Sequence, residues 1–331
     1  MFGRKAIPVA VSLLCAVSVL TAPAQEPIQD SAYENRLETK AVRKRRSALR
    51  RPKKDTPEEQ LHYALDLRNN GKLRKAAQQY RALVHHWHES EQATYAQLAY
   101  AEILEAQKKY AQAFKEYQYL LDFYGSNYPY EDVLERQFRI AHTLMTGRRG
   151  EALGFDGFRD PARALPFLEQ VIESAPNGKY SAVSQFYIGV IHEDAKDYVD
   201  AVSAYEMLLY RYPRSSHAAD GAFRRANSLV ELARRAANDE AAAEEAMAAL
   251  AQFIRRFPEH EGIAQAQKSL DALRVRVSTK HYQIAEFYDR IARRPEAALI
   301  SYRYYVQRFP YTELATAAEK RIEALEAEST P

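Results

Sequence analysis

The chain has 331 residues, of which 27% are charged and 47% hydrophobic, and its mean hydropathy is −0.52. This balance excludes an integral membrane protein and a low-complexity disordered chain, and the single cysteine excludes a disulfide-based scaffold. Glycine is scarce at 11 residues, which favours helices over a fold that depends on glycine turns.

Residues 1–24 have the features of a secretory signal peptide. Arg4 and Lys5 precede an apolar run over residues 6–20, which is too short to span a bilayer comfortably. The small residues of Ala22-Pro23-Ala24 then offer a cleavage site, after which Gln25 would be the new N-terminus. We therefore expect export to a bacterial periplasm.

Cys15 lies in the middle of this apolar run, directly after Ser12-Leu13-Leu14. A lipid-attachment site has a small residue just before the modified cysteine, so we do not expect lipidation. Cleavage after Ala24 would remove Cys15, and with it thiol catalysis and cysteine metal ligands.

Residues 25–55 are expected to form a disordered basic linker. The stretch from Lys40 to Lys54 contains nine basic residues and no acidic residue, so no amphipathic face can close over a core. It is either a solvated tether or a contact for an anionic membrane surface, such as phospholipid or lipopolysaccharide headgroups. We do not expect an exported chain to bind nucleic acid. Once residues 25–54 and the two signal-peptide cations are set aside, the formal net charge of +3 becomes −5 for the rest of the chain.

A pattern with helical spacing recurs six times between Thr56 and Pro310. Each unit has an alanine in the same register: Ala76, Ala113, Ala164, Ala201, Ala246 and Ala298. A bulky residue follows four positions later: Tyr80, Tyr117, Leu168, Tyr205, Leu250 and Tyr302. Another follows after three more positions: Leu83, Leu120, Val171, Leu208, Phe253 and Tyr305. Because residues three and four apart share a helix face, these positions predict one buried stripe of a helix in each unit.

A partner helix is predicted upstream of each stripe. Small residues stand twelve positions before the alanine, or thirteen in the last case: Ala64, Ala101, Gly189 and Ala285. They would allow two antiparallel helices to approach closely, since larger side chains would push the axes apart. Three units also end in a proline after an aromatic residue, at Pro213, Pro258 and Pro310.

This pattern resembles the tetratricopeptide repeat, a helical hairpin with small residues, an aromatic residue and a terminal proline at matching positions. The resemblance implies an all-α superhelical array of about six hairpins, closed by a capping helix near Glu313 to Glu326. We divide the array into N-terminal repeats over residues 56–176 and C-terminal repeats with the capping helix over residues 177–331.

Two units contain insertions. Residues 146–160 hold four of the chain's eleven glycines together with Phe155 and Phe158. These phenylalanines either fold back onto a neighbouring hairpin or contact a partner protein. The insertion from Asn238 to Glu245 is acidic and rich in alanine, so we expect it to lengthen a helix.

The sequence shows no sign of catalysis. His85-His86-Trp87-His88 is the one histidine cluster, and adjacent histidines on a helix point to different faces, which does not suit a metal site. Motifs for a serine nucleophile, a zinc protease or a phosphate-binding loop are missing from the sequence. We therefore expect a non-enzyme without metal or cofactor, whose function depends on its surfaces.

In an array of this kind, the first helices of the hairpins line a concave groove. By their place in the repeat, these residues should point into it: Leu65, Arg68, Asn69, Tyr95, Leu98, Glu102, Glu105, Phe138, His142, Met145, Phe186, Val190 and Glu193. This mixture of aromatic, amide and charged groups suits an extended or helical peptide segment. Alternatively, several of these side chains only seal the contact between hairpins.

One family is similar beyond the repeat itself. His281-Tyr282-Gln283-Ile284-Ala285-Glu286-Phe287-Tyr288, the basic turn Arg293-Arg294 and the end Arg308-Phe309-Pro310-Tyr311-Thr312 resemble the last hairpins of the BamD family. The resemblance implies a periplasmic scaffold on the outer membrane, with C-terminal repeats that dock on BamA and N-terminal repeats that receive unfolded β-barrel precursors. We expect partner docking at Phe155, Phe158, Arg290, Arg293 and Arg294.

Two features differ from that family, whose members are lipoproteins with about five repeats. A second interpretation is a periplasmic tetratricopeptide protein of the Tol-Pal division system, although residues 26–56 lack the heptads of its coiled coil. A third is a scaffold for an envelope complex that synthesises polysaccharide.

Overall fold

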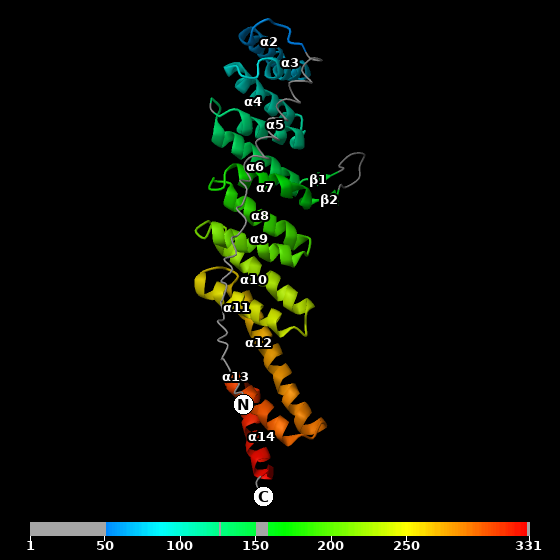
Figure 1. The fold of residues 1–331 in the computed structure, drawn as a ribbon, viewed down its shortest axis with the longest axis vertical. Coiled ribbons are helices and arrows are strands. Elements are labelled where there is room, and N and C mark those ends of the chain that lie inside the picture. The colour runs from blue at the N-terminus through cyan, green and yellow to red at the C-terminus, as the bar shows by residue number, and fades with distance from the viewer. Residues whose placement is uncertain (1–50, 126, 150–157, 330–331) are drawn as a thin grey trace, which may run out of the picture.

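The computed structural model describes residues 51–125, 127–149 and 158–329. The hairpins follow one another along the long axis, from α2 at one end to α14 at the other (Figure 1). The predicted signal peptide and residues 25–50 of the predicted linker lie outside the described residues.

Six helical hairpins and a final helix make up the array. The hairpins are α2 (Pro57–Asn69) with α3 (Leu73–His86), α4 (Glu91–Ala106) with α5 (Tyr110–Phe123), α6 (Tyr130–Thr146) with α7 (Leu165–Ser174), α8 (Ser181–Asp194) with α9 (Tyr198–Arg211), α10 (Ala218–Arg235) with α11 (Glu240–Arg256), and α12 (Ile263–Glu286) with α13 (Pro295–Arg308). Helix α14 (Glu313–Ser329) packs on α13. The predicted all-α array of tetratricopeptide hairpins with a capping helix is confirmed.

The first helices lie on the inner side of the array. Helix α2 contacts α4, α8 contacts α10, and α10 contacts α12, although a second helix stands between them in the chain. Such contacts between successive first helices are expected where they line the concave side of a curved stack.

The repeat residues that were predicted to be buried form the core of the array. All six repeat alanines have no exposed surface, and the twelve bulky residues that follow them are at most 1% exposed. Gly189 shows why its position must be small, since a Cβ there would overlap the ring of Tyr205. The close approach of the two helices in this hairpin therefore depends on glycine.

A tight turn joins the helices in four of the hairpins. The residue five positions before the repeat alanine has a positive φ in each: Gly71 (71°), Lys108 (57°), Lys196 (64°) and Arg293 (51°). Three of these are not glycine, so the packing of the two helices holds them in a left-handed conformation that costs free energy. The hairpins with insertions do not use this turn.

Buried glutamines clamp the first, second and fourth hairpins and join the third to the second, a feature not predicted from the sequence. Gln60, Gln97 and Gln185 donate hydrogen bonds from Nε2 to the backbone oxygens of the residues 19 positions later, at 3.2, 2.8 and 3.0 Å. Gln137 instead donates to the Gln118 side chain at 2.9 Å. All four glutamines are at most 8% exposed.

The structured part of the chain begins before the predicted end of the linker at residue 55. The predicted disordered linker extends to residue 55, but the backbone N–H groups of Lys53 and Lys54 donate to Oε1 of Gln60, at 2.9 and 3.0 Å. The chain is therefore fixed from these residues onward. Thr56 then caps α2 by accepting a hydrogen bond from the backbone N–H of Glu59.

The two insertions differ in structure. In the first, β1 (Arg148–Arg149) pairs antiparallel with β2 (Phe158–Arg159), and the short helix η2 (Pro161–Ala164) leads into α7. Phe158 lies in β2, whereas Phe155 lies outside the described residues. The second insertion extends α11, which begins at Glu240, as expected.

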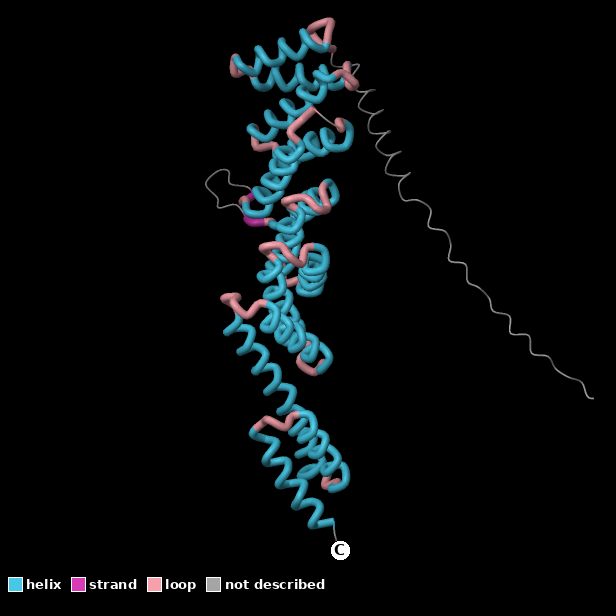
Figure 2. Tube along the Cα trace, turned by 90° about the vertical axis from the view of Figure 1, so that its left-hand side faces the viewer, coloured by secondary structure: helices cyan, strands magenta, loops and turns pink. Residues whose placement is uncertain are grey.

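Helix α12 is longer than any other described helix, with 24 residues. The interval from a repeat alanine to the small residue of the next first helix is 25 positions from Ala201 to Ala226. From Ala246 to Ala285 it is 39 positions. The excess of 14 lies within α12, because both first helices begin 17 positions after the alanine. The sixth hairpin is consequently displaced along α12 from the fifth (Figure 2). No helix in the described ranges is both long enough and apolar enough to span a membrane.

Candidate peptide-binding groove

The structure brings three of the predicted groove residues together in one ion-pair network. Arg68 Nη2 lies 2.9 Å from Oε2 of Glu102. Arg136 bridges Glu102 and Glu105 at 3.3 and 3.0 Å, and Arg139 contacts Glu105 at 2.7 Å. The network joins the first three hairpins through α2, α4 and α6. A cavity of about 400 Å³ opens beside it, also lined by Tyr110 and Thr143.

Glu105 is the centre of this network. Tyr117 donates its hydroxyl hydrogen to Oε2 of Glu105 at 2.7 Å. Burial alone would raise the pKa of Glu105, but hydrogen bonds from Tyr117, Arg139 and Arg136 outweigh it and hold this pKa below its usual value. Burial, reinforced by the nearby carboxylate, raises the pKa of Tyr117. Glu105 is therefore ionised and Tyr117 neutral at physiological pH.

An aromatic sector continues the groove from α6 to α8. The Phe138 ring stacks on Tyr180 with centroids 5.0 Å apart, and His142 lies 5.3 Å from the Tyr187 ring. Phe138 and Tyr187 are themselves 6.2 Å apart. All four side chains are half-buried, so they seal the junction and remain partly accessible to solvent.

The other predicted groove residues divide into two groups. Tyr95 is 52% exposed, and Asn69 is also exposed. Leu65, Leu98, Met145 and Val190 are partly buried against the core clusters, as the alternative of a sealed contact between hairpins predicts. Phe186 is a correction: it is only 8% exposed and packs in the core, so it does not line an open groove.

The contact of Glu105 with Tyr117 recurs along the array. In the fourth hairpin Tyr205 donates to Glu193 at 2.7 Å, and in the sixth Tyr302 donates to Asp289 at 3.3 Å. In each case an arginine of the next first helix or of α14 binds the same carboxylate: Arg136, Arg224 and Arg321. Each of these tyrosine–carboxylate–arginine triads fastens a hairpin to the next element of the array.

Glu105 and Glu193 are predicted from the sequence, whereas the arginines are not. The available signal was a carboxylate twelve residues before Tyr117 and Tyr205, and thirteen before Tyr302. An acceptor at that spacing lies at the end of the first helix, opposite the buried tyrosine, and an arginine must come from outside the hairpin.

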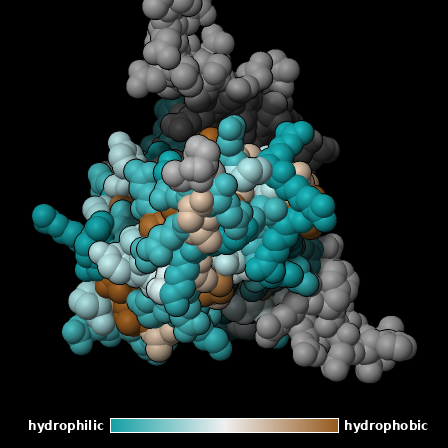
Figure 3. Space-filling view, turned by 90° about the horizontal axis from the view of Figure 1, so that it is seen from below, coloured by the Kyte–Doolittle hydropathy of each residue, from teal (hydrophilic) through white to brown (hydrophobic). Residues whose placement is uncertain are grey.

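The predicted docking arginines lie at the far end of the array, beside exposed apolar side chains. Arg290 is 72% exposed and pairs with Glu286 at 3.3 Å, and Arg293 and Arg294 are exposed in the turn before α13. Ile284, Phe287 and Ile291 are 42, 48 and 73% exposed, at a spacing that places them on one side of the end of α12 and the following η3 (Phe287–Ile291). Seen from this end, apolar patches interrupt a mainly hydrophilic surface (Figure 3).

The histidine cluster has a structural role. His88 Nε2 lies 2.6 Å from the hydroxyl of Tyr119, and its ring stacks on Tyr124 with centroids 5.3 Å apart. Across the part of the chain that the structure describes, no group of three or more His, Cys, Asp or Glu side chains could hold a metal ion.

Several solved structures of tetratricopeptide proteins are similar to this chain. YrrB, a tetratricopeptide protein with an unusual peptide-binding site, is 17% identical, with 63% of this chain and 90% of YrrB covered and a TM-score of 0.32. The C-terminal part of a repeat-containing protein from Cytophaga hutchinsonii is 16% identical, with 87% and 95% covered and a TM-score of 0.33. A protein from Parabacteroides merdae is 14% identical, with 82% and 98% covered and a TM-score of 0.30. No curated protein matches the chain.

Family models match both parts of the array. A tetratricopeptide repeat model matches residues 64–129, which cover most of the first two hairpins. The model of the YfiO family, described as outer membrane lipoprotein, matches residues 159–328, from β2 to the end of α14. This second match spans more than half of the chain and confirms the resemblance to BamD seen in the sixth hairpin. The chain belongs to the YfiO family.

Proposed function

We propose that the protein is a non-catalytic scaffold of the machinery that assembles β-barrel proteins in the outer membrane. Its N-terminal repeats would bind peptide segments of unfolded precursors, and its C-terminal repeats would dock on a BamA-like partner. The observation that carries this proposal is the YfiO match over residues 159–328. The family description also supports a location in the cell envelope, in the periplasm at the outer membrane.

The groove of the first three hairpins suits a peptide segment that carries no particular charge. Its three arginines and two glutamates largely neutralise each other, so a bound segment must compete with ion pairs already formed. The exposed ring of Tyr95 and the half-buried rings of Phe138 and Tyr187 remain available for apolar and aromatic side chains. These are the residues that dominate membrane-facing β-strands.

The end of the sixth hairpin suits a protein partner. Ile284, Phe287 and Ile291 offer apolar area beside the cationic Arg290, Arg293 and Arg294. Apolar anchors rimmed by arginine are typical of protein interfaces. Phe155 and Phe158 remain proposed as a further partner contact.

Crosslinking and capture from the cell envelope test the proposal. Recovery of a BamA-like protein supports it, whereas recovery of TolA or of polysaccharide-synthesis enzymes in its place would contradict it. The double variant Phe287→Asp, Ile291→Asp should abolish capture of the BamA-like protein. Val199→Asp, at a residue of the fourth hairpin that is 64% exposed, is the matched control and should leave capture unchanged.

A photo-crosslinker at position 95 tests the groove separately. It should label unfolded β-barrel precursors, and a crosslinker at Val199 should not. Equal labelling from both positions would contradict a peptide site in the groove.

The N-terminus of the mature protein distinguishes the two routes to the membrane. We expect mass spectrometry to find a chain that begins at Gln25 without lipid. A lipid-modified chain that begins at Cys15 would instead show a covalent anchor and make the basic linker unnecessary for attachment.

A further inference from the structure

A second cavity lies on the other side of the N-terminal repeats from the groove. It has a volume of about 680 Å³ and lies between α3, α4 and the start of α5. Tyr100 and Leu104 of α4 line it, whereas Glu102 and Glu105 of the same helix line the groove. At 100° per residue these two pairs point to opposite sides of α4. The cavity is therefore separate from the candidate peptide site.

The charge of this cavity is one-sided. Arg51, Arg74, Arg81 and Lys109 line it, and no acidic residue does. This contrasts with the groove, where every arginine has a carboxylate partner, and with the net charge of −5 outside the signal peptide and residues 25–54. Arg74, Arg81 and Lys109 make no ion pair with any other described residue. Three cations around one cavity repel each other unless an anion joins them.

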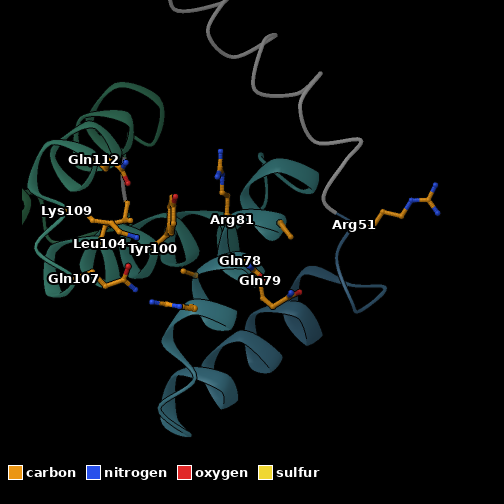
Figure 4. Close-up of a pocket in the computed structure, with 12 residues that line it drawn as sticks. Arg51, Gln78, Gln79, Arg81, Tyr100, Leu104, Gln107, Lys109 and Gln112 are labelled. Carbon is orange, nitrogen blue, oxygen red and sulfur yellow. The ribbon is translucent and has the colours of Figure 1, made fainter.

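The remaining lining defines the chemistry of the ligand. Gln78, Gln79, Gln107 and Gln112 supply amides that can both donate and accept hydrogen bonds. Figure 4 shows Arg81 and Tyr100 projecting to the same side of the cavity, with Gln112 and Lys109 opposite Arg81, while Arg51 points away from them. An arginine fork suits a phosphate group, and amides with an aromatic ring suit the hydroxyls of a polyol.

The position of the cavity indicates where such a ligand comes from. Arg51 is the point at which the basic stretch from Lys40 to Lys54 reaches the array. A stretch with nine basic residues is attracted to an anionic membrane surface, so the cavity would be held close to lipid headgroups.

We infer that the cavity between α3, α4 and α5 binds the phosphate-bearing headgroup of an anionic lipid through Arg74, Arg81 and Lys109. This binding would fix the N-terminal repeats on the membrane at one defined point, which a disordered tether cannot do. The inference does not rest on the proposed role in β-barrel assembly, because neither the groove nor the end of the sixth hairpin takes part.

Sedimentation with vesicles tests the inference. The purified protein should bind phosphatidylcholine vesicles that contain phosphatidylglycerol, and not phosphatidylcholine vesicles alone. The double variant Arg81→Gln, Lys109→Gln should lower the affinity by about 30-fold, since each of the two cations near a membrane contributes about fivefold. Arg81→Lys keeps the charge but loses the fork, so its affinity should fall between the two.

The matched control is Lys75→Gln, Lys115→Gln. It removes the same charge from α3 and α5, at exposed residues that do not line the cavity. Its affinity should stay within about threefold of the original protein. An equal loss in both double variants would show general attraction to the surface and overturn the inference, as would an unchanged affinity in the cavity variant. Unchanged circular dichroism and melting verify that each variant is folded.

A titration with soluble glycerol phosphate distinguishes the source of the phosphate. Competition with vesicle binding in the original protein, lost in the cavity variant, supports a headgroup site. Binding of glycerol phosphate in the cavity without any binding to vesicles would assign the cavity to a soluble phosphate ester and overturn the lipid assignment.

Discussion

The array fills the same buried position in two ways. The second, fourth and sixth hairpins bury Tyr117, Tyr205 and Tyr302, whereas the third and fifth bury Leu168 and Leu250. Four residues after the small residue of the first helix, the tyrosine hairpins have a carboxylate and the leucine hairpins have Met145 or Val230. Polar residues thus accompany the tyrosines and apolar residues accompany the leucines.

This difference shows how a buried hydroxyl creates contacts between repeats. A buried tyrosine needs an acceptor, and the carboxylate that accepts its hydrogen bond needs a cation, which only the next element can provide. A leucine needs none of these and is satisfied within its own cluster. The tyrosine hairpins are therefore fastened to the next element by charge at this position. The leucine hairpins are packed with apolar side chains here, and their polar contacts with the next hairpin lie elsewhere, as between Glu240 and Arg308.

The largest expected loss of stability comes from the buried repeat alanines, which both kinds of hairpin share. Ala201→Phe in a tyrosine hairpin and Ala246→Phe in a leucine hairpin should each lower the free energy of unfolding by about 1 to 3 kcal/mol, because both alanines lie fully buried at a close helix contact. Urea unfolding measures the loss. Ala111→Phe, at an exposed position of α5, is the control. A tolerated Ala246→Phe would mean that only the tyrosine hairpins are tightly packed.

The second test replaces the buried leucine of a leucine hairpin with tyrosine. Leu250→Tyr should lower the free energy of unfolding by about 1 to 3 kcal/mol, because its hydroxyl would be buried beside Val230 without an acceptor. Leu250→Phe adds a similar ring without the hydroxyl and serves as the control. Addition of Val230→Glu to Leu250→Tyr should recover part of the loss. If Tyr and Phe at position 250 proved equally stable, the partner carboxylates would have no such role.

The pH dependence of stability should report on the carboxylates of the tyrosine hairpins. Hydrogen bonds from Arg321 hold the pKa of Asp289 below its usual value, as those from Tyr117, Arg139 and Arg136 do for Glu105. A carboxyl whose pKa is lower in the folded state stabilises the fold above its unfolded pKa, and this contribution is lost as the pH falls through the folded value. The unfolding free energy should therefore decrease below about pH 5.

Glu105→Gln identifies the source of this decrease. The variant should be less stable at neutral pH but lose less stability on acidification, because its side chain cannot be protonated in this range. Glu89→Gln, at an exposed residue, should follow the original curve. An identical slope for Glu105→Gln and the original protein would exclude Glu105 as a contributor.

The smallest effect is expected in the first hairpin, where Arg68 replaces the carboxylate and the hydroxyl of Tyr80 has no hydrogen-bond partner among the described residues. Arg68→Ala removes a half-exposed ion pair with Glu102, which typically contributes about 0.5 kcal/mol. Thermal unfolding should show almost no change. A large loss would mean that the pair fastens the first two hairpins as strongly as a triad.

The features that depend on spacing within one hairpin could be predicted from the sequence. Those that depend on contacts with neighbouring elements could not. Alanines and bulky residues at fixed intervals identified the core, because burial repeats with the helical period. Arg136, Arg224 and Arg321 escaped because each lies in the next element, outside the spacing within one hairpin, although they follow their carboxylates at nearly constant intervals of 31, 31 and 32 residues. The glutamine clamp escaped because a single polar residue within an apolar stripe looks like a surface position. Phe186 was placed in the groove by repeat position alone, which does not report how deeply a neighbour covers a side chain.

The length of α12 sets both the distance and the rotation of the last hairpin. Fourteen extra residues rise about 21 Å and make nearly four whole turns, so the sixth hairpin moves along the axis while keeping almost the same angular orientation. Removal of seven residues would shorten the offset by about 10 Å with little rotation, whereas removal of nine would turn the hairpin by about half a turn. The distance of the last hairpin and its orientation can thus be changed separately, and the length of one uninterrupted helix sets both.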